Sequence, residues 1–387
     1  MGKFHKIVLV LGIIFAVFYC TSCGKSQDVQ WNAGNHDIST KLCYEYSMEL
    51  EYATEFAVDY YSDGFILISI SDGSRFLLNT RKEDIPKDLN SDIVVLDGFA
   101  DNIYLVASAT MDMFDAIDAL DHISLSGTSA ENWYIENAKQ AMEAGTIQYA
   151  GKYSAPDYEL ILSTDCGLAI ESTMILHSPE VKEKLEGFNI PVLVDYSSYE
   201  SHPLGRTEWV KLYGVLTGKE EQAEAAFVEQ ENAYRELGEV EATGKTVVFF
   251  YITSNETVVV RKTNDYVSKM IELAGGTYLF SELTQEDNAA SSVNMQMEEF
   301  YAKAKDADYL VYNSTIDGEL TSIDELLEKS EFLKDFKAVQ KGNVWCTTQN
   351  VYQQSMNSGK MIEEFHNMLT AEDTDEENEN KYLFQLQ

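Results

Sequence analysis

Residues 102–120 read NIYLVASATMDMFDAIDAL, and two hydrophobic patterns follow each other within this segment. The first part, residues 103–107, is a short apolar run that is typical of a buried strand. Ser108 and Thr110 come next as candidate N-caps of a helix, because their side chains can accept hydrogen bonds from free backbone N–H groups. Apolar side chains then recur at helical spacing, at Met111, Phe114, Ile117 and Leu120. The segment therefore predicts a strand followed directly by an amphipathic helix.

The alternation of strand and helix continues beyond this segment. Further buried strands are predicted at residues 159–163, 191–195, 246–252, 309–313 and 344–347. Helical patterns lie between them, at residues 181–185, 266–273 and 323–327. Strands that alternate with helices favour βαβ units and a mainly parallel sheet, so the chain is predicted to be α/β.

Residues 204–240 separate the two alternating regions. They look helical throughout, apart from a break near Gly218. We therefore expect two α/β lobes with central, mainly parallel sheets, at residues 101–203 and 241–387, joined by one long linking helix. A length of 387 residues with 45% hydrophobic residues is ample for two such cores.

Residues 42–100 follow a different pattern. The turn signals Ser62-Asp63-Gly64 and Ser71-Asp72-Gly73-Ser74 bracket an apolar run at residues 65–70. This arrangement predicts a small antiparallel β meander as an N-terminal extension. The sequence gives no functional account of it.

The start of the chain has the features of an export signal. Lys3 and Lys6 precede an apolar run over residues 7–19, which is shorter than the roughly 20 residues of a membrane span. The following Cys20-Thr21-Ser22-Cys23-Gly24 resembles a bacterial lipobox, although Cys20 stands where leucine is usual. This predicts a signal peptide at residues 1–22, lipidation of Cys23 and a tether at residues 23–41. A plain secretory signal and an N-terminal anchor helix are the alternatives.

The formal net charge is −37, from 28 basic and 65 acidic residues. Such a chain repels nucleic acid, whose binding needs clustered Lys and Arg. It also repels anionic lipid head groups, so attachment to the outer face of the cytoplasmic membrane must come from the lipid. The cysteines after Cys23 are too few and too scattered for a disulfide framework: Cys43, Cys166 and Cys346.

The sequence lacks the common motifs of enzymatic chemistry. Gly238 and Gly244-Lys245-Thr246 resemble a phosphate loop, but the spacing is one residue too long and the segment precedes a strand. The sequence has neither a Gly-x-Ser-x-Gly elbow nor a His-Glu-x-x-His helix. The six histidines show no pairing at helical spacing. We therefore expect no catalytic residue, no cofactor and no direct metal ligand.

Four segments, in this order, carry a resemblance to a known family. They are NIYLVASATM at 102–111, IPVLVD at 190–195, HPLGRTEW at 202–209, and MIELAGG at 270–276 after Tyr266. Together they resemble the ABC-importer binding proteins for ferric siderophores, haem and cobalamin, in which one long helix joins two α/β lobes. The resemblance covers residues 102–368. It implies a monomer that captures a ligand and delivers it to permease and ATPase subunits.

The resemblance also implies two docking residues. In this family one glutamate of each lobe docks onto transporter arginines. Glu171 and Glu298 stand at about the expected places, and Glu299 competes with Glu298. The alternative is that each is an ordinary exposed carboxylate on a very acidic protein.

Ligands of doubly wound sheets bind beyond the carboxyl ends of the strands, which selects the loops there. Two of these loops carry arginine, at Arg206 and Arg261, and a guanidinium can bridge carboxylate, catecholate or hydroxamate oxygens. Arg206 could instead pair with Glu208. The other candidates for ligand contact are Ser108, Trp133, Thr164, Tyr199, His202 and Tyr266, although aromatic residues are more often core.

The sequence therefore favours a lipid-anchored receptor for a ferric siderophore or similar iron complex. A corrinoid or haem receptor is the alternative within the same class. A surface enzyme and a surface adhesion protein are the alternatives from other classes.

Overall fold

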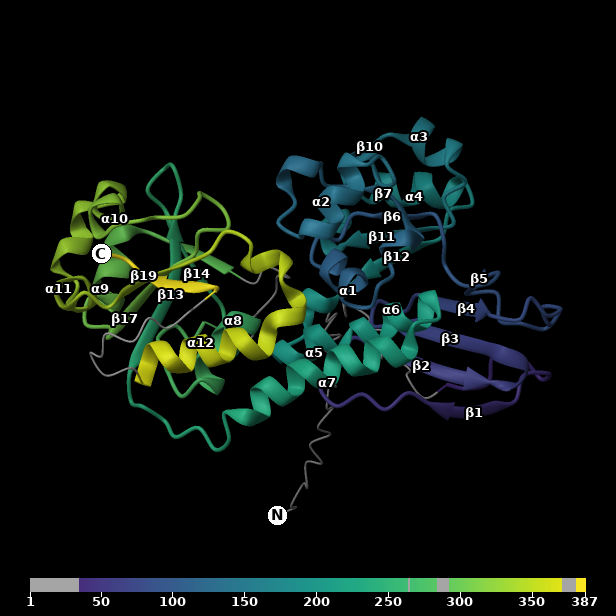
Figure 1. The fold of residues 1–387 in the computed structure, drawn as a ribbon, viewed down its shortest axis with the longest axis horizontal. Helices are drawn as coiled ribbons and strands as arrows, with labels where there is room; N and C mark the ends of the chain where they lie inside the picture. The colour runs from purple at the N-terminus through teal and green to yellow at the C-terminus, as the bar shows by residue number, and fades with distance from the viewer. Residues whose placement is uncertain (1–34, 264, 284–291, 371–380) are drawn as a thin grey trace, which may run out of the picture.

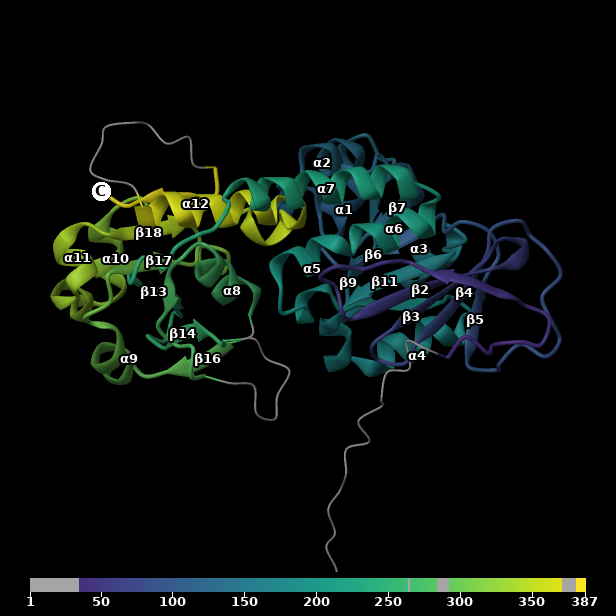
Figure 2. The ribbon, with the colours of Figure 1, turned by 90° about the horizontal axis from the view of Figure 1, so that it is seen from below.

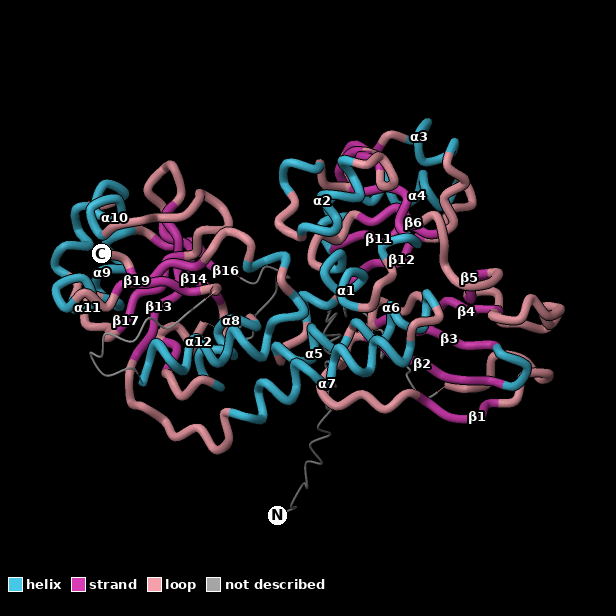
Figure 3. The backbone as a smooth tube through the Cα atoms, in the orientation of Figure 1, coloured by secondary structure: helices cyan, strands magenta, loops and turns pink. Residues whose placement is uncertain are grey.

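The computed structural model describes residues 35–263, 265–283, 292–370 and 381–387. Along its long axis the C-terminal lobe lies at one end, and the N-terminal lobe and the extension lie side by side at the other (Figure 1). The predicted signal peptide and Cys23 lie outside the described residues. None of the helices in these ranges combines the length and hydropathy of a membrane span. The strands gather in three separate groups, one for each of these bodies (Figure 3).

The extension is a five-stranded sheet in sequence order. Its strands are β1 (Tyr44–Ser47), β2 (Phe56–Tyr61), β3 (Phe65–Ile70), β4 (Arg75–Asn79) and β5 (Ile93–Leu96). The predicted antiparallel meander is confirmed for β1–β4, and β5 joins β4 in parallel. Asp63 and Gly64 make the tight turn between β2 and β3 with φ of 64° and 80°, a conformation that glycine and aspartate adopt most easily.

Both faces of the extension sheet are covered. Phe56, Val58 and Ile68 belong to the same apolar core as the N-terminal lobe. Leu67 and Leu77 point to the other face, where Ile38 packs on them with no exposed surface. Residues 35–41, which the sequence places in the tether, therefore include a buried part of the fold.

The N-terminal lobe has a parallel sheet in the order β12-β11-β6-β7-β8. The strands are β6 (Ile103–Leu105), β7 (Ile123–Ser126), β8 (Gln148–Tyr149), β11 (Leu168–Ser172) and β12 (Val192–Asp195). The helices are α1 (Thr110–Ala116), α2 (Glu136–Glu143), α3 (Tyr158–Ser163) and α4 (Pro179–Gly187), and a small hairpin pairs β9 (Gly151–Lys152) with β10 (Ala155–Pro156).

One predicted strand of this lobe is wrong. Residues 159–163 belong to helix α3, and the strand that follows is β11. The side chain of Asp157 caps the helix by accepting a 3.1 Å hydrogen bond from the backbone N–H of Leu160. Only Ile161 of α3 is fully buried, as expected for a surface helix. A short apolar run does not separate strand from helix by periodicity alone.

The linking element is three helices rather than one. They are α5 (Pro203–Glu208), α6 (Val210–Thr217) and α7 (Glu220–Glu236). Gly218, with φ of 73°, ends α6 at the predicted break. Every residue of α6 is buried, because the helix lies between the N-terminal lobe and the extension sheet (Figure 2). Most of α6 is apolar, as expected of an enclosed helix, and its charged residue Lys211 pairs with Glu208 at 3.2 Å.

The C-terminal lobe has a seven-stranded mixed sheet in the order β16-β14-β13-β17-β18-β19, with β15 beside β13. The strands are β13 (Thr246–Ile252), β14 (Val258–Arg261), β15 (Thr277–Tyr278), β16 (Ser292–Met295), β17 (Tyr309–Tyr312), β18 (Val344–Thr347) and β19 (Leu383–Gln385). The helices are α8 (Tyr266–Leu273), α9 (Met297–Ala304), α10 (Ile323–Lys329), α11 (Lys337–Lys341) and α12 (Ser358–Thr370). The predicted mainly parallel centre is confirmed, since β13, β17 and β18 pair in parallel.

Candidate functional site

The loops at the carboxyl ends of the two central sheets meet at the lobe junction. In the N-terminal lobe these loops follow β6 and β7. In the C-terminal lobe the chain leaves β18 and crosses to the other lobe as residues 351–357, which we call the interlobe strap. It consists of two 3-10 turns, Val351–Gln353 and Ser355–Asn357, and leads into α12. Since ligands of doubly wound sheets bind outside the carboxyl ends of strands, this junction is the candidate site.

Gln353 of the strap binds the loop that follows β7. Its side chain is fully buried. The amide nitrogen donates to the carbonyl of Asn132 at 2.9 Å, and the amide oxygen accepts from the backbone N–H of Tyr134 at 2.8 Å. The rings of Tyr134 and Tyr352 meet edge to face, with centroids 6.5 Å apart. One amide side chain thus fastens the C-terminal lobe to the N-terminal lobe.

Asp112 of helix α1 binds the strap from the other side. Its carboxylate accepts a 2.7 Å hydrogen bond from the backbone N–H of Met356. Burial raises the pKa of Asp112 to about 7, and Asp115 adds to the rise. The Met356 N–H and the charges of Lys381 and Arg206 act in the opposite direction. Asp112 therefore titrates near neutral pH within the junction.

Arg206 projects from α5 into the junction. Its guanidinium carbon lies 4.4 Å from the centroid of the Tyr266 ring, and the residue is only 8% exposed. Its Nε is buried and has no hydrogen-bond partner among the described residues. A buried donor without an acceptor is costly, so it is suited to an acceptor that arrives with a ligand.

Arg261 lies at the end of β14, which runs antiparallel to β13. It pairs with Asp265 at 3.6 Å, and Asp265 caps α8 by accepting from the backbone N–H of Val267 at 2.9 Å. Burial acts to lower the pKa of Arg261, but Asp265 and Tyr266 outweigh it and raise the pKa. Of the two predicted arginines, Arg206 thus contacts the ring of Tyr266, and Arg261 pairs with the N-cap of the same helix.

The comparisons with known proteins give the family. A family model described as periplasmic binding protein matches residues 84–351, more than half of the chain. The chain belongs to the periplasmic binding protein family. The resemblance inferred from the sequence is confirmed, and so is the α/β fold of two lobes. The family and its structural neighbours are binding proteins of ABC importers for iron, haem or vitamin B12 types of ligand.

Relatives of this binding protein are distant. An uncharacterised lipoprotein of Methanocaldococcus jannaschii is 23% identical over 383 residues, which covers 90% of this chain and 89% of the relative. The haem-binding protein HutB of Vibrio cholerae is 16% identical with a TM-score of 0.56, over 70% of this chain and 100% of HutB. A protein of the Fe3+-hydroxamate transport system of Saccharomonospora viridis is also 16% identical, with a TM-score of 0.55, over 71% of this chain and 95% of that protein.

Two further predicted site residues lie on carboxyl-edge loops of this binding protein. Ser108 follows β6 and is half-buried. Trp133 lies in the loop after β7, but it is only 4% exposed and packs within the core of the N-terminal lobe. Its Nε1 has no hydrogen-bond partner in the described part of the chain. The contact of either residue with a ligand stays a prediction.

Thr164 lies at the wrong edge of the sheet. Because α3 replaces the predicted strand, Thr164 comes before β11, and its hydroxyl donates to the carbonyl of Ile161 at 3.0 Å. The neighbouring Gly167 donates its N–H to the carbonyl of Asn102, just before β6. This is the amino end of both strands, so Thr164 does not lie on a carboxyl-end loop, and its contact with a ligand stays a prediction.

Tyr199 and His202 lie in the segment between β12 and α5, and His202 contacts the extension. The ring of Tyr199 meets that of Tyr196 edge to face, with centroids 5.2 Å apart, and burial, with a smaller effect of Glu55, raises the pKa of Tyr199. His202 stacks on Tyr52 with ring centroids 4.7 Å apart, and its Nδ1 accepts from the N–H of Leu204 as the N-cap of α5. Burial lowers the pKa of His202 to about 4, with a smaller effect of Lys269. Both residues make structural contacts here, and their contact with a ligand stays a prediction.

The structure separates the two predicted docking glutamates. Glu298 is exposed in the first turn of α9, with Glu299 beside it. Glu171 lies inside β11 with no exposed surface, so it is not available for docking in this conformation. Neither carboxylate oxygen of Glu171 has a hydrogen-bond partner among the described residues. Burial alone raises the pKa of Glu171 to about 8, so the side chain is neutral at pH 7.

Sequence reasoning missed the residues of the strap and Asp112. A strand was predicted at residues 344–347, but the predicted ligand-binding loops all follow other strands. Gln353 was therefore not among the predicted site residues. The same carboxyl-end rule applied to that strand selects the loop that leads to Gln353. Asp112 gave no such signal, because it is one of four aspartates repeated along residues 112–121.

Proposed function

We propose that this protein is the lipid-anchored substrate-binding subunit of an ABC importer, and that it captures a ferric siderophore or similar iron complex. One observation carries the proposal most directly: Arg206 is buried at the lobe junction, stacks on Tyr266 and has an unpaired Nε, in a protein with a net charge of −37. Arginine is scarce in this chain, and paired guanidinium donors match anionic chelate oxygens. The free Nε of Arg206 supplies a donor for such an oxygen.

A haem or corrinoid ligand is the second candidate within this class. The aromatic pair Tyr134 and Tyr352 supports it, because the two rings come from different lobes and a flat macrocycle needs apolar walls. A surface enzyme or adhesion protein is the alternative from other classes, and permease-independent turnover or binding of a protein partner would support it.

We also propose lipidation at Cys23, which the lipobox-like sequence supports. A relative that matches 90% of this chain is named a lipoprotein. The lipid would hold the receptor at the outer face of the cytoplasmic membrane and raise its effective concentration near the permease.

For docking on the permease we propose Glu298 together with Glu180, which takes the place of the buried Glu171. Glu180 is exposed in the first turn of α4, which follows the carboxyl end of β11. Glu298 is exposed in the first turn of α9, which follows β16. Both β13 and β16 pair antiparallel with β14, so they run in the same direction and α9 begins at the carboxyl edge of its sheet. Each lobe therefore has one helix whose acidic first turn lies at the carboxyl edge of the sheet.

The ligand proposal is tested by tryptophan-fluorescence titration with ferric hydroxamates, ferric catecholates, haem and cobalamin. We expect saturable one-to-one binding of one ferric siderophore, weakened at least tenfold by Arg206→Ala or Arg261→Ala. Arg81→Ala is the matched control, because Arg81 is exposed on the extension. Binding of haem or cobalamin alone would favour the second candidate, and no binding across the panel would contradict both.

The docking proposal is tested by uptake of the bound ligand in cells that carry the cognate permease. We expect Glu180→Lys and Glu298→Lys to abolish uptake while ligand affinity stays unchanged. Glu186→Lys is the control, because Glu186 is an exposed glutamate of the last turn of α4. Normal uptake by both docking variants would contradict this assignment.

A further inference from the structure

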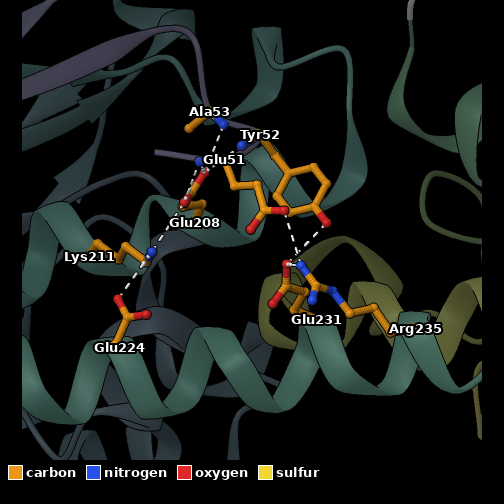
Figure 4. Close-up of polar contacts among 8 residues, drawn as sticks. All are labelled: Glu51, Tyr52, Ala53, Glu208, Lys211, Glu224, Glu231 and Arg235. Carbon is orange, nitrogen blue, oxygen red and sulfur yellow. Dashed lines mark hydrogen bonds and ion pairs between the residues drawn. The ribbon is translucent and has the colours of Figure 1, made fainter. Parts of the chain in front are cut away.

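Two buried carboxylates, one on α5 and one just before it, hold the extension. Glu208, with no exposed surface, accepts from three consecutive backbone N–H groups, those of Glu51 at 3.0 Å, Tyr52 at 2.9 Å and Ala53 at 2.8 Å (Figure 4). Glu200 is 1% exposed and accepts from the next two, those of Thr54 at 2.9 Å and Glu55 at 3.0 Å. Five successive amides of the extension are therefore bound by two side chains. Hydrogen bonds to an ionised acceptor are stronger than neutral ones.

Charged neighbours complete this attachment. Lys211 lies 3.2 Å from Glu208 and 3.1 Å from Glu224, so the buried carboxylate has a counter-charge (Figure 4). Further along α7, the hydroxyl of Tyr52 donates to Glu231 at 3.1 Å. Arg235 pairs with Glu231 at 2.6 Å and with Glu51 at 3.0 Å. Both α5 and α7 are thus fixed to the same short segment, residues 51–55.

The backbone of the extension approaches α5 at Gly205. A Cβ at this position would lie 2.8 Å from the carbonyl oxygen of Tyr52 and 3.1 Å from its carbonyl carbon. Real Cβ atoms do not come so close to backbone, so a side chain at residue 205 would push residues 51–53 away. Glycine here is required by the close approach of two backbones.

The same turn of α5 also holds the C-terminal lobe. Arg206 stacks on Tyr266 of α8. Thr207 donates its hydroxyl to the carbonyl of Ser355 in the strap at 2.8 Å. Of four consecutive residues, Gly205 and Glu208 contact the extension, and Arg206 and Thr207 contact the C-terminal lobe. Because α5 is only six residues long, the groups that bind it set its orientation, and its own helical stability contributes little.

We propose that the N-terminal extension positions the ligand-binding arginine: Glu200 and Glu208 hold α5 from one side and so fix Arg206 on the other. This gives residues 42–100 a role at the lobe junction, although they supply no ligand contact themselves. Glu200 and Glu208 are positioning residues in this scheme. The proposal rests on the proposed function, in which Arg206 binds the ligand.

Hydrogen–deuterium exchange of the full chain in detergent tests this coupling without a ligand. Two variants detach the extension in different ways. Gly205→Ala pushes residues 51–53 away by its methyl group, and because alanine is the better helix former it does not weaken α5. Glu208→Gln replaces one carboxylate oxygen by an amide N–H₂ group. The side chain then offers at most one oxygen to the three backbone N–H donors. Glu224→Gln is the matched control, because it also removes a charge beside Lys211 but binds no amide of the extension.

We expect both detaching variants to speed exchange at least tenfold in residues 51–55, and also in the strap and in the first turn of α8. The control and the strand β17 should be unchanged. Faster exchange confined to residues 51–55 in Gly205→Ala would overturn the proposal, because the extension would then be attached without being coupled. If Glu208→Gln fails to fold, Gly205→Ala alone decides.

A second readout separates this proposal from the proposed function. For a ferric siderophore that the wild-type chain binds, Gly205→Ala should weaken binding at least fivefold through a faster dissociation rate, and Glu224→Gln should leave it unchanged. Unchanged affinity in Gly205→Ala would contradict positioning of Arg206. If the wild-type chain binds no member of the panel, the proposed function fails, whereas the exchange result still tests whether the extension controls the junction.

Discussion

Met356 of the C-terminal lobe donates its backbone N–H to the carboxylate of Asp112 in the N-terminal lobe at 2.7 Å. This hydrogen bond crosses the lobe junction, and the carboxylate that accepts it is 8% exposed. Burial raises the pKa of Asp112 from 3.8 to about 7, so the group binds a proton more tightly in the folded state than in the unfolded state. The stability of the junction is therefore linked to pH.

The first prediction concerns Asp112→Asn. The stabilisation that goes with the raised pKa is fully present below pH 3.8 and is lost as pH rises through about 7. The unfolding free energy of Asp112→Asn minus that of the wild type should therefore rise by about 2–4 kcal/mol from pH 4 to pH 8. Urea denaturation of both proteins at the two pH values measures this. If the difference in unfolding free energy between the two proteins were the same at both pH values, Asp112 would have an ordinary pKa.

Glu171 gives the second prediction. Its folded pKa is about 8 against 4.5 for an exposed glutamate, so its contribution to stability is lost as pH rises through about 8. Glu171→Gln should become more stable relative to the wild type by about 2–5 kcal/mol between pH 5 and pH 9. Glu298→Gln is the control, because Glu298 is exposed. Equal pH dependence of the two variants would show that Glu171 is hydrated and leave it open as a docking residue.

Segments with a single strong pattern were predicted correctly from the sequence. Residues 192–194 of β12 are a continuous apolar run after Pro191, and residues 247–252 of β13 are a longer run of apolar and aromatic residues. Both are strands in the structure. The break at Gly218 was also expected, because glycine adopts the left-handed conformation that ends α6.

Residues 158–172 show why the rest was not predictable. The short run at 159–163 fits a strand or a helix, and the wrong choice moved β11 out of place. Thr164 was therefore expected at the carboxyl edge of the sheet, whereas it lies at the amino edge. Long-range partners leave no local pattern: Glu208 and Tyr52 are 156 residues apart, and any of 65 acidic residues could have been the partner.

The third prediction concerns the strap. Gln353→Ala removes both hydrogen bonds to the loop after β7 and leaves the carbonyl of Asn132 and the N–H of Tyr134 without these partners. We expect a loss of about 2–4 kcal/mol in unfolding free energy. Gln354→Ala is the matched control, because Gln354 accepts only from Asn357 within the strap. Equal losses in the two variants would mean that the amide of Gln353 does not fasten the lobes.

The fourth prediction concerns the crossing of α12 and α7, which lie side by side in both views of the ribbon (Figures 1 and 2). A Cβ at Gly359 would lie 2.3 Å from the carbonyl oxygen of Gln230, so alanine there must separate the two helices. We expect Gly359→Ala to cost about 1–3 kcal/mol in unfolding free energy, as other overpacked sites do.

Gly187→Ala is the control for this crossing. Gly187 ends α4, and a Cβ there would meet nothing within 4 Å. Because alanine has the higher helix propensity, this variant should be neutral or more stable by up to about 1 kcal/mol. Urea denaturation measures both variants. If Gly359→Ala were as stable as the wild type, the two helices would have room to move apart, and α12 would not hold the C-terminal lobe against the linking element.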